Sequence, residues 1–407
     1  YYIPMDRCRY SIPTLGLTHN QTFDLIIIGG GINGAAVARD ASLRGLSVCL
    51  LEKDTLGHGT SSRSSKLAHG GLRYLEQFQF SMVKETLLER DRLFKNAPQY
   101  TQALSCLLPV YRHDKRPLWQ IRLGLWLYSK LATQSVLPPH RILSANAVLA
   151  ECPLLKPDQL SGGALYFDGQ LMDYDLVIAN AQDAIAHGAV VAEHTPVTDL
   201  ITHNGVVEGV HIQHHGQVLA LKAPRVLNVT GPWSNHIARM ANPNAEPLVA
   251  PTKGVHLVIR SLGIPHALTL QHPRDHRVFF ILPWDDHTLV GTTDTPFTGN
   301  PDTVSVDDDD IDYLLDACNA TLTQSIGRAD IVDQFAGLRP LQHSNRGTSK
   351  RSRDFVCTQS KPGLFHMVGG KYTAYRHMAE VILDTLLDRT PPQHPLRPCI
   401  TAITPLP

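Results

Sequence analysis

Three glycines and one acid near the start of the chain have the types and spacing that bind a dinucleotide. They are Gly29, Gly31, Gly34 and Glu52, within the segment FDLIIIGGGINGAAVARDASLRGLSVCLLE of residues 23–52. Gly29 permits a tight turn, Gly31 lets the backbone approach a pyrophosphate, and Gly34 lets a helix pack closely on a strand. The acid can accept hydrogen bonds from ribose hydroxyl groups. The pattern predicts a nucleotide phosphate at the positive end of a helix.

The elements that must position these residues are a strand, a helix and a second strand. Residues 25–28 are all apolar and run directly into the first glycine. A helical stretch follows until Gly45, and the apolar residues 48–51 then end on Glu52. A glycine-rich turn in an ordinary βαβ unit would not need this terminal acid, so the full context favours nucleotide binding.

The same order of strand, turn and helix returns in the middle and near the end of the chain. Residues 255–260, 277–282 and 288–291 instead resemble short antiparallel strands. We therefore predict an α/β fold with a Rossmann-like dinucleotide-binding domain built from discontinuous segments and an inserted substrate domain containing a largely antiparallel β-sheet. The predicted segments are 20–95, 172–245 and 335–390 for the dinucleotide-binding domain, 96–171 and 246–334 for the substrate domain, and 1–19 and 391–407 for terminal extensions.

The composition excludes several classes of protein. The 37 Lys and Arg residues balance the 37 Asp and Glu residues, which gives no electrostatic case for nucleic acid as a partner. The seven cysteines are dispersed without a CxxC pair, which argues against a disulfide framework or a zinc site and indicates a reducing compartment. The four acids at 307–310 favour the first turn of a helix, and we expect no metal there.

A second block, TSSRSSKLAHGGLRYLEQ at residues 60–77, continues as a predicted helix over residues 71–94. Together with GGGINGA, TGPW, KGVH, GTTDTPFTG, GLRPL, SRD and GGKYTAYR, in this order, it resembles the FAD-dependent glycerol-3-phosphate dehydrogenases. The resemblance covers about residues 23–387. Ala374 stands where the family usually has Thr. The family usually continues after this block with a sizeable helical domain, so the resemblance is to a short form that lacks it.

The resemblance implies non-covalently bound FAD, because no His-Cys attachment signature is evident. The single glycine fingerprint is assigned to FAD, so NAD is not expected as the electron acceptor. Thr373, at a helix start, is expected to cap that helix near the flavin. The residues that the resemblance places on FAD are Gly29, Gly31, Gly34, Glu52, Thr60, Ser61, Val197, Gly231, Gly337, Gly370, Lys371 and Thr373.

The resemblance also implies a pocket for glycerol 3-phosphate. Arginine forks and a lysine ammonium group suit a phosphate dianion. His256 is the candidate that accepts or polarises the hydroxyl proton, although Arg339 or Lys371 could polarise the same oxygen. Thr293 and Asp294 either position His256 or line the pocket, or they form a turn between strands. The implied substrate-binding residues are Arg73, Tyr74, His256, Arg339, Arg353 and Lys371, and no metal is expected.

The electron acceptor is the least specified part of the prediction. Residues 119–132 form a short amphipathic helix in which Trp119, Leu123 and Trp126 share a face. This face either packs on the protein itself or lies on a membrane surface, and no apolar run approaches the roughly 20 residues that span a bilayer. The resemblance favours a quinone acceptor and a cytoplasmic protein at the inner face of the membrane.

The sequence thus predicts oxidation of sn-glycerol 3-phosphate to dihydroxyacetone phosphate by FAD, with electrons passed to a membrane quinone. One alternative is an oxidase or dehydrogenase of an amine or a 2-hydroxy acid on the same fold. Another is a non-catalytic flavin-binding subunit. The oligomeric state and the identity of the general base stay open.

Overall fold

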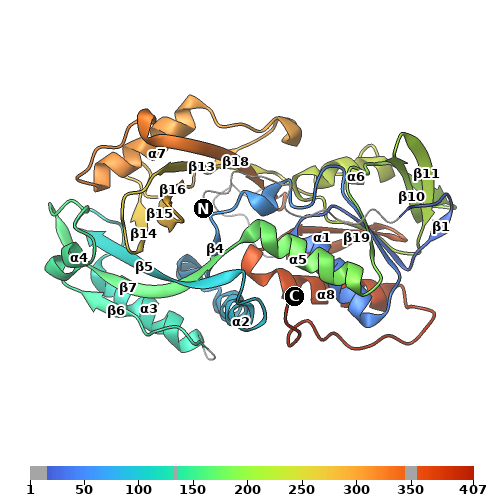
Figure 1. The fold of residues 1–407 in the computed structure, drawn as a ribbon, viewed down its shortest axis with the longest axis horizontal. Helices are drawn as coiled ribbons and strands as arrows, with labels where there is room; N and C mark the ends of the chain where they lie inside the picture. The colour runs from blue at the N-terminus through green and yellow to red at the C-terminus, as the bar shows by residue number, and fades with distance from the viewer. Residues whose placement is uncertain (1–15, 133–134, 344–354) are drawn as a thin grey trace.

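The described part of the chain forms three β-sheets and the helices that cover them, in a computed structural model (Figure 1). The structure describes residues 16–132, 135–343 and 355–407. The α-helices are α1 (Ile32–Arg44), α2 (Phe80–Asn96), α3 (Leu118–Leu131), α4 (Ala145–Glu151), α5 (Asp173–Ala186), α6 (Ser234–Ala241), α7 (Asp308–Thr321) and α8 (Tyr375–Arg389). Short 3-10 turns are η2 (Thr60–Ser62), η3 (Leu72–Gln77), η4 (Gly231–Trp233), η5 (Pro301–Thr303), η6 (Arg328–Asp330) and η8 (Tyr372–Ala374).

A six-stranded sheet carries the glycine fingerprint. Its strand order is β19-β20-β12-β2-β3-β8, and all neighbours are parallel except β19 and β20. Strands that are covered on both faces must be apolar along their whole length, and every residue of β2 and β3 is buried. The strands are β2 (Leu25–Ile28), β3 (Val48–Leu51), β8 (Val190–Ala192), β12 (Val226–Asn228), β19 (Phe355–Lys361) and β20 (Leu364–Gly369).

Different layers cover the two faces of this sheet. Leu25 and Ile27 pack against α1, α5 and α8, which lie side by side in Figure 1. Ile26 and Ile28 point the other way, as alternation along a strand requires, and pack against a four-stranded sheet of order β1-β11-β10-β9. The strands of this smaller sheet are β1 (Gln21–Thr22), β9 (Val197–His203), β10 (Val206–His214) and β11 (Gln217–Lys222).

The third sheet is ten-stranded and antiparallel except where β5 pairs with β14. One of its faces packs against α4 and α7, and the other face packs against Ile121 and Leu125 of α3. Its strands are β4 (Leu67–Ala68), β5 (Thr101–Tyr111), β6 (Arg141–Leu143), β7 (Leu160–Leu171), β13 (Thr252–Arg260), β14 (Ala267–Gln271), β15 (Val278–Trp284), β16 (His287–Gly291), β17 (Thr295–Pro296) and β18 (Ile331–Arg339).

The predicted fold class is confirmed. The parallel part of the six-stranded sheet takes β2 and β3 from the start of the chain, β8 and β12 from the middle, and β20 from the end. The largely antiparallel sheet is built from the intervening segments. The residue boundaries given above for the two domains stay a prediction.

The helix predicted over residues 71–94 is interrupted, and that prediction is wrong in this respect. Phe78 has a φ of +57°, in the left-handed region, and its N–H group bonds back to the carbonyl oxygens of Leu75 and Tyr74. This geometry closes η3, and α2 starts again at Phe80. The break leaves η3, which contains the candidate substrate residues Arg73 and Tyr74, as a separate turn before α2.

The acids at 307–310 form the start of α7, as predicted. Asp307 and Asp310 make a reciprocal capping box, and Lys253 pairs with both carboxylates at 2.5 and 2.6 Å. Among the residues that the structure describes, no group of His, Cys, Asp and Glu side chains is arranged to hold a metal ion. None of the helices in these residue ranges is long and apolar enough to cross a membrane.

Candidate functional site

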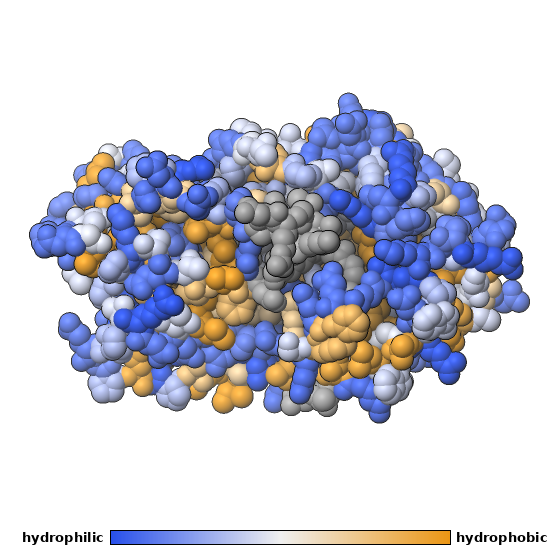
Figure 2. Space-filling model, turned by 180° about the vertical axis from the view of Figure 1, so that it is seen from behind, coloured by the Kyte–Doolittle hydropathy of each residue, from blue (hydrophilic) through white to orange (hydrophobic). Residues whose placement is uncertain are grey.

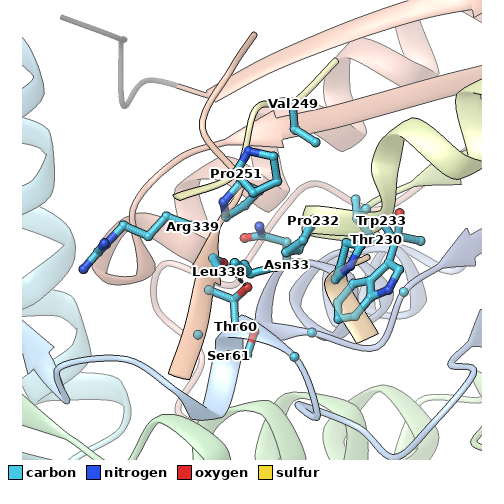
Figure 3. Close-up of a pocket in the computed structure, with 18 of the residues that line it drawn as sticks. Asn33, Thr60, Ser61, Thr230, Pro232, Trp233, Val249, Pro251, Leu338 and Arg339 are labelled. Atoms are coloured by element: carbon cyan, nitrogen blue, oxygen red, sulfur yellow. Dashed lines mark hydrogen bonds between the residues drawn. The ribbon is translucent and has the colours of Figure 1, made fainter. Parts of the chain in front are cut away.

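A cavity of about 1060 Å³ lies where the carboxyl ends of β2 and β3 face the ten-stranded sheet (Figure 3). Its lining includes Gly31 and Glu52 from the nucleotide-binding side, and His256 and Arg339 from the other side. Open α/β sheets bind ligands at the carboxyl ends of their strands. The cavity therefore joins the glycine fingerprint to the candidate catalytic residues.

The turn between β2 and α1 requires glycine at each of the three fingerprint positions. Gly29 has a φ of +113°, which other residues rarely adopt. A Cβ atom on Gly34 would lie 1.9 Å from the carbonyl oxygen of Gly29, so glycine is needed for α1 to start this close to β2. A Cβ atom on Gly31 would lie 2.9 Å from Oγ of Ser61, on the lining of the cavity.

The glycine turn and the N-terminus of α1 together form a nucleotide cradle that opens into the cavity. The N–H group of Ile32 donates a 2.9 Å hydrogen bond to Oγ of Ser61. Asn33 also lines the cavity, and its Oδ1 atom is buried without a hydrogen-bond partner among the described residues. Helix N–H groups and a hydroxyl group, beside glycines that leave space, fit the pyrophosphate end of a dinucleotide.

Glu52 ends β3 at the edge of the cavity, as predicted. Its carboxylate accepts hydrogen bonds from the N–H groups of Gly30 at 2.7 Å and Asp54 at 2.9 Å. Burial is the largest influence on this group and raises the pKa of Glu52, while these two bonds act in the opposite direction. Both carboxylate oxygens retain acceptor capacity for the hydroxyl groups of a ribose.

The other predicted nucleotide contacts mostly reach the cavity. Thr60, Ser61, Val197, Gly231, Gly337, Gly370 and Lys371 line it. Gly34 lies under the turn and supports it, as described above. Thr373 does not cap the following helix, so that prediction is wrong: its Oγ1 atom instead accepts a 3.1 Å hydrogen bond from the N–H group of His69. The side chain of Thr373 thus connects η8 to the loop between β4 and η3.

Arg339, at the end of β18, reaches the cavity from the substrate side (Figure 3). Its guanidinium group donates to Oγ1 of Thr292 at 2.9 Å and to the carbonyl oxygen of Thr293 at 3.1 Å. The nearest oxygen of Asp294 is 3.3 Å away, which is longer than a strong charge-assisted hydrogen bond. Arg339 is therefore held by two neutral oxygens and by the carboxylate of Asp294, with its guanidinium group at the lining of the cavity.

Lys371 lies on the same cavity and is supported by Tyr74. Its Nζ atom is 3.8 Å from the centre of the Tyr74 ring, a cation–π contact. Tyr74 is buried and does not itself line the cavity, so its predicted role as a hydroxyl donor to the substrate stays a prediction. Of the two remaining cations, Arg73 belongs to η3 with a side chain outside the description, and Arg353 lies outside the described residues.

His256 lies on β13, 2% exposed, with its ring stacked on Phe335 at 4.9 Å between ring centres. Its Nε2 atom is 2.9 Å from Oγ of Ser65. Burial, followed by the nearby charges of Arg339 and Lys66, lowers the pKa of His256 well below its usual value. The imidazole is therefore neutral at pH 7 and able to accept a proton.

Thr293 and Asp294 do not contact the His256 ring through any hydrogen bond in the described residues. Thr293 is buried, and its Oγ1 atom accepts a 3.0 Å hydrogen bond from the N–H group of Val255. Asp294 approaches Arg339 instead. Of the two interpretations, the turn that supports neighbouring residues fits this geometry better.

The cavity-lining residues that sequence reasoning missed include Arg63, Ser65 and Trp233. Arg63 and Ser65 belong to the block TSSRSSK, whose high serine content was the available signal. Their partners, however, come from distant strands: Ser65 meets His256, and a Cβ atom on Gly337 would lie 2.9 Å from Cβ of Arg63. Spacing along the chain contains no information about these pairs.

Comparisons with known proteins identify the family of this chain. A family model described as FAD dependent oxidoreductase matches residues 24–376. The glycerol-3-phosphate dehydrogenase of Synechocystis sp. is 36% identical over 95% of this chain and 74% of its own length. The D-erythritol 1-phosphate dehydrogenase of Brucella abortus is 39% identical over 88% of this chain and 72% of its own.

A solved structure gives the same result for the fold. The glycerol-3-phosphate dehydrogenase from Bacillus halodurans, complexed with FAD, superimposes with a TM-score of 0.76 at 29% identity, covering 94% of this chain and 67% of that one. The chain spans 54% of the length of mitochondrial relatives that it matches.

Proposed function

The chain belongs to the family of FAD-dependent oxidoreductases, and we propose that it oxidises sn-glycerol 3-phosphate to dihydroxyacetone phosphate. The observation that carries the proposal is that His256, Arg339 and Lys371 line the same cavity as the nucleotide cradle. A polyol phosphate needs cations for its phosphate group and a proton acceptor for the hydroxyl group that is oxidised. Relatives with this activity in their names, 36% identical over most of the chain, support the same substrate.

FAD fits the nucleotide side of the cavity. The N-terminus of α1 and the glycine turn would hold its pyrophosphate, and Glu52 would bind its ribose. Gly337 and Gly370 line the cavity and would meet the flavin ring with their backbones. When bound there, FAD accepts the hydride from the carbon atom that carries the substrate hydroxyl.

Arg339 and Lys371 are the described cations that we assign to the phosphate group. The guanidinium fork of Arg339 can give two parallel hydrogen bonds to phosphate oxygens, and Lys371 supplies a compact positive charge. Two cations exceed what a carboxylate substrate requires, which is why we prefer a phosphate ester over an amino acid or a 2-hydroxy acid. Arg73 and Arg353 complete the predicted set.

His256 is our candidate for the group that receives the hydroxyl proton. The described charged groups around it are cationic, so it stays neutral and has a free lone pair. Arg339 and Lys371 are positive donors, which suits them to polarise the substrate oxygen but not to accept its proton. The division of roles we propose is therefore acceptance by His256 and polarisation by the cations.

A four-carbon polyol phosphate is a second candidate substrate. The Brucella relative, which is named for D-erythritol 1-phosphate, is 39% identical to this chain. Both substrates present a phosphate ester beside a secondary hydroxyl group, so the same cations and the same proton acceptor would serve either. The length of the cavity beyond the phosphate would then decide the preference.

Anaerobic mixing of the flavin-loaded protein with each substrate tests the proposal. We expect sn-glycerol 3-phosphate to bleach the flavin absorbance in a single turnover, and glycerol, glycine and lactate to leave it unchanged. Faster bleaching by D-erythritol 1-phosphate would select the second candidate. Bleaching by an amine or a 2-hydroxy acid alone would favour the alternative oxidases, and no bleaching by any of them would favour a flavin-binding subunit.

A membrane quinone is the electron acceptor that we propose, and α3 is the surface that would bring the protein to it. Trp119 and Trp126 are 68% and 53% exposed, and Leu123 lies between them on the same surface. Figure 2 shows apolar side chains gathered low on the rear face, where α3 lies. The interpretation of this face as one packed on the protein itself is not supported by such exposure.

The surroundings of α3 suit an interface between water and lipid. Phe78, at the break before α2, adds another exposed aromatic ring, and Arg122 and Lys130 are exposed on α3. Aromatic rings beside cations are typical of helices that lie in the headgroup region. We propose the inner face of the cytoplasmic membrane as the location, because anionic lipids there would attract these cations.

A further inference from the structure

Ser65 and His256 are in contact at the lining of the cavity. Ser65 lines the cavity, and its Oγ atom is 2.9 Å from Nε2 of His256. The imidazole is 2% exposed, and its Nδ1 atom is buried without a hydrogen-bond partner among the described residues. Of the two imidazole nitrogens of His256, Nε2 is therefore the one with a hydrogen-bond partner among the described residues, and that partner is the hydroxyl group of Ser65.

The segment around Ser65 is held rigidly by one buried carboxylate. Asp173, the first residue of α5, accepts hydrogen bonds from Oγ of Ser64 at 2.7 Å and from Nζ of Lys66 at 2.5 Å. Lys66 also donates to the carbonyl oxygen of Ser62 at 2.8 Å. Because Asp173 binds the residue on each side, Ser65 is left to project away from it, toward His256.

The backbone at this point adopts a conformation that costs energy. Lys66 has a φ of +56°, in the left-handed region that is unfavourable for a long side chain. Such a conformation is unfavourable for a residue other than glycine and persists where the surroundings impose it, often at functional sites. The buried pair of Lys66 and Asp173 imposes it here, and the result is the fixed distance between Ser65 and His256.

We propose that Ser65 is a catalytic residue that relays the substrate proton to His256. This inference rests on the proposed function. As the C–H bond of the substrate carbon breaks, the hydride leaves with both electrons to FAD and the C–O bond becomes a carbonyl. The hydroxyl proton passes to Oγ of Ser65, and the proton of Ser65 passes to Nε2 of His256. Ser65 ends as a neutral hydroxyl, and His256 ends as an imidazolium that must later release its proton.

The charges around the relay match a phosphate substrate. Lys66 pairs with Asp173, and Arg339 pairs with Asp294 at 3.3 Å. A bound phosphate dianion would offset Arg339 and make the protonated form of His256 less costly. The relay is therefore most effective when the phosphate is in place, which would make a polyol without phosphate a poor substrate in rate as well as in affinity.

Anaerobic single-turnover reduction with sn-glycerol 3-phosphate tests the relay in flavin-loaded protein. Ser65→Ala is expected to lower the limiting rate of flavin reduction by roughly 100-fold or more, with flavin content and apparent substrate affinity unchanged. Ser65→Thr retains a hydroxyl group and is expected to recover part of the rate. Ser62→Ala is the matched control, because Ser62 lies in the same segment but does not line the cavity; its rate is expected to equal that of the wild type.

The pH profile of the same reaction distinguishes a relay from a structural role. The wild-type rate should fall toward acid pH as His256 becomes protonated, with an apparent pKa below about 6.5. The charged groups near His256 are Lys66 and Arg339, while Phe335 and Gly291 bring no charge. In Ser65→Ala this acid limb should disappear, because His256 is no longer connected to the substrate.

The outcomes separate the two proposals. If wild-type protein is reduced by the substrate and Ser65→Ala is reduced at the same rate with the same pH profile, the relay is wrong and the proposed function stands. A slow Ser65→Ala variant that keeps the wild-type acid limb also contradicts the relay. If no polyol phosphate reduces the wild-type flavin, the proposed function is wrong and the relay falls with it.

Discussion

The indole N–H group of Trp233 donates a 2.9 Å hydrogen bond to Asp302, across the mouth of the cavity. Trp233 belongs to η4 on the nucleotide side, and Asp302 belongs to η5, in the loop between β17 and α7. Lys53, next to Glu52, pairs with the same carboxylate and also lies 4.5 Å from the centre of the Trp233 ring. The three side chains join the loop of residues 297–303 to the cradle that we assign to FAD.

This connection predicts faster loss of FAD from Asp302→Ala. The bonds are partly exposed, so we expect a loss of about 0.2–1 kcal/mol, which corresponds to a dissociation rate roughly 1.4-fold to fivefold higher. Stopped-flow recovery of free-flavin fluorescence after dilution measures the rate. Asp309→Ala, an exposed acid on α7 away from the cavity, serves as the control, and equal rates in the two variants would contradict the prediction.

Replacement of Gly31 by Val should abolish FAD binding. The new side chain would start 2.9 Å from Oγ of Ser61 and extend into the space of the pyrophosphate. Purified wild-type protein should be yellow, and acid precipitation should release the flavin to the supernatant because no covalent bond holds it. Gly327→Val, at a position where a Cβ atom would be 4.0 Å from the nearest atom, should remain yellow. Flavin that stays in the acid pellet would contradict non-covalent binding.

Arg339→Ala should weaken transition-state binding strongly. Removing one partner of a charged contact typically costs about 2–5 kcal/mol, so kcat/KM for sn-glycerol 3-phosphate should fall by at least about 30-fold. Arg260→Ala provides a matched control, since Arg260 is an exposed residue at the end of β13. Steady-state kinetics with both variants decides the point, and an unchanged kcat/KM in Arg339→Ala would remove this residue from the site.

Buried histidines should make the fold sensitive to acid. Burial lowers the pKa of His366 to about 4, while Asn228 donates to its Nδ1 atom at 2.9 Å. The unfolded chain, with a histidine pKa of about 6.5, binds this proton more readily, so the stability contributed by neutral His366 is present above pH ~6.5 and is lost as pH falls toward ~4.

Urea unfolding between pH 7 and pH 4 measures this dependence. His366 should contribute a slope of up to about 1.4 kcal/mol per pH unit within the window, and His366→Gln should reduce the slope. His394→Gln, on the segment after α8, should leave it unchanged because the side chain is exposed. A slope that is the same in wild type and His366→Gln would show that other groups control acid unfolding.

The parts of this protein that are predictable from sequence are those with local causes. The glycine turn follows from steric limits within a few residues, and the buried strands follow from apolar runs that must be covered on both faces. The contact of Ser65 with His256 joins residues 191 positions apart and depends on how two sheets meet. The side chain of Thr373 was misassigned for the same reason. Its hydroxyl group binds His69, which is distant in the sequence, and does not cap the helix that follows Thr373.

The break at Phe78 and the orientation of α3 have a different origin. A periodic pattern of apolar residues identifies a helix but not which side faces the protein. On α3 the buried face is Ile121, Leu125 and Tyr128, and the hydroxyl group of Tyr128 accepts a 2.8 Å hydrogen bond from the N–H group of Gly70. A hydropathy pattern does not reveal this hydrogen bond, which holds the Tyr128 face against the protein and leaves Trp119 and Trp126 on the outer face.

Replacing Trp126 with Glu is the test of the membrane proposal. The residue is exposed, so the variant should fold, bind FAD and be reduced by substrate at the wild-type rate. A charge in an inserted face opposes transfer to the lipid boundary, so co-sedimentation with anionic liposomes and reduction of a membrane quinone should both decrease. Gln120→Glu, on the same helix and only half-buried, controls for added negative charge. If wild type and Trp126→Glu sediment equally, α3 does not bind membranes; if the variant unfolds, Trp126 supports the fold in a way that its exposure does not suggest.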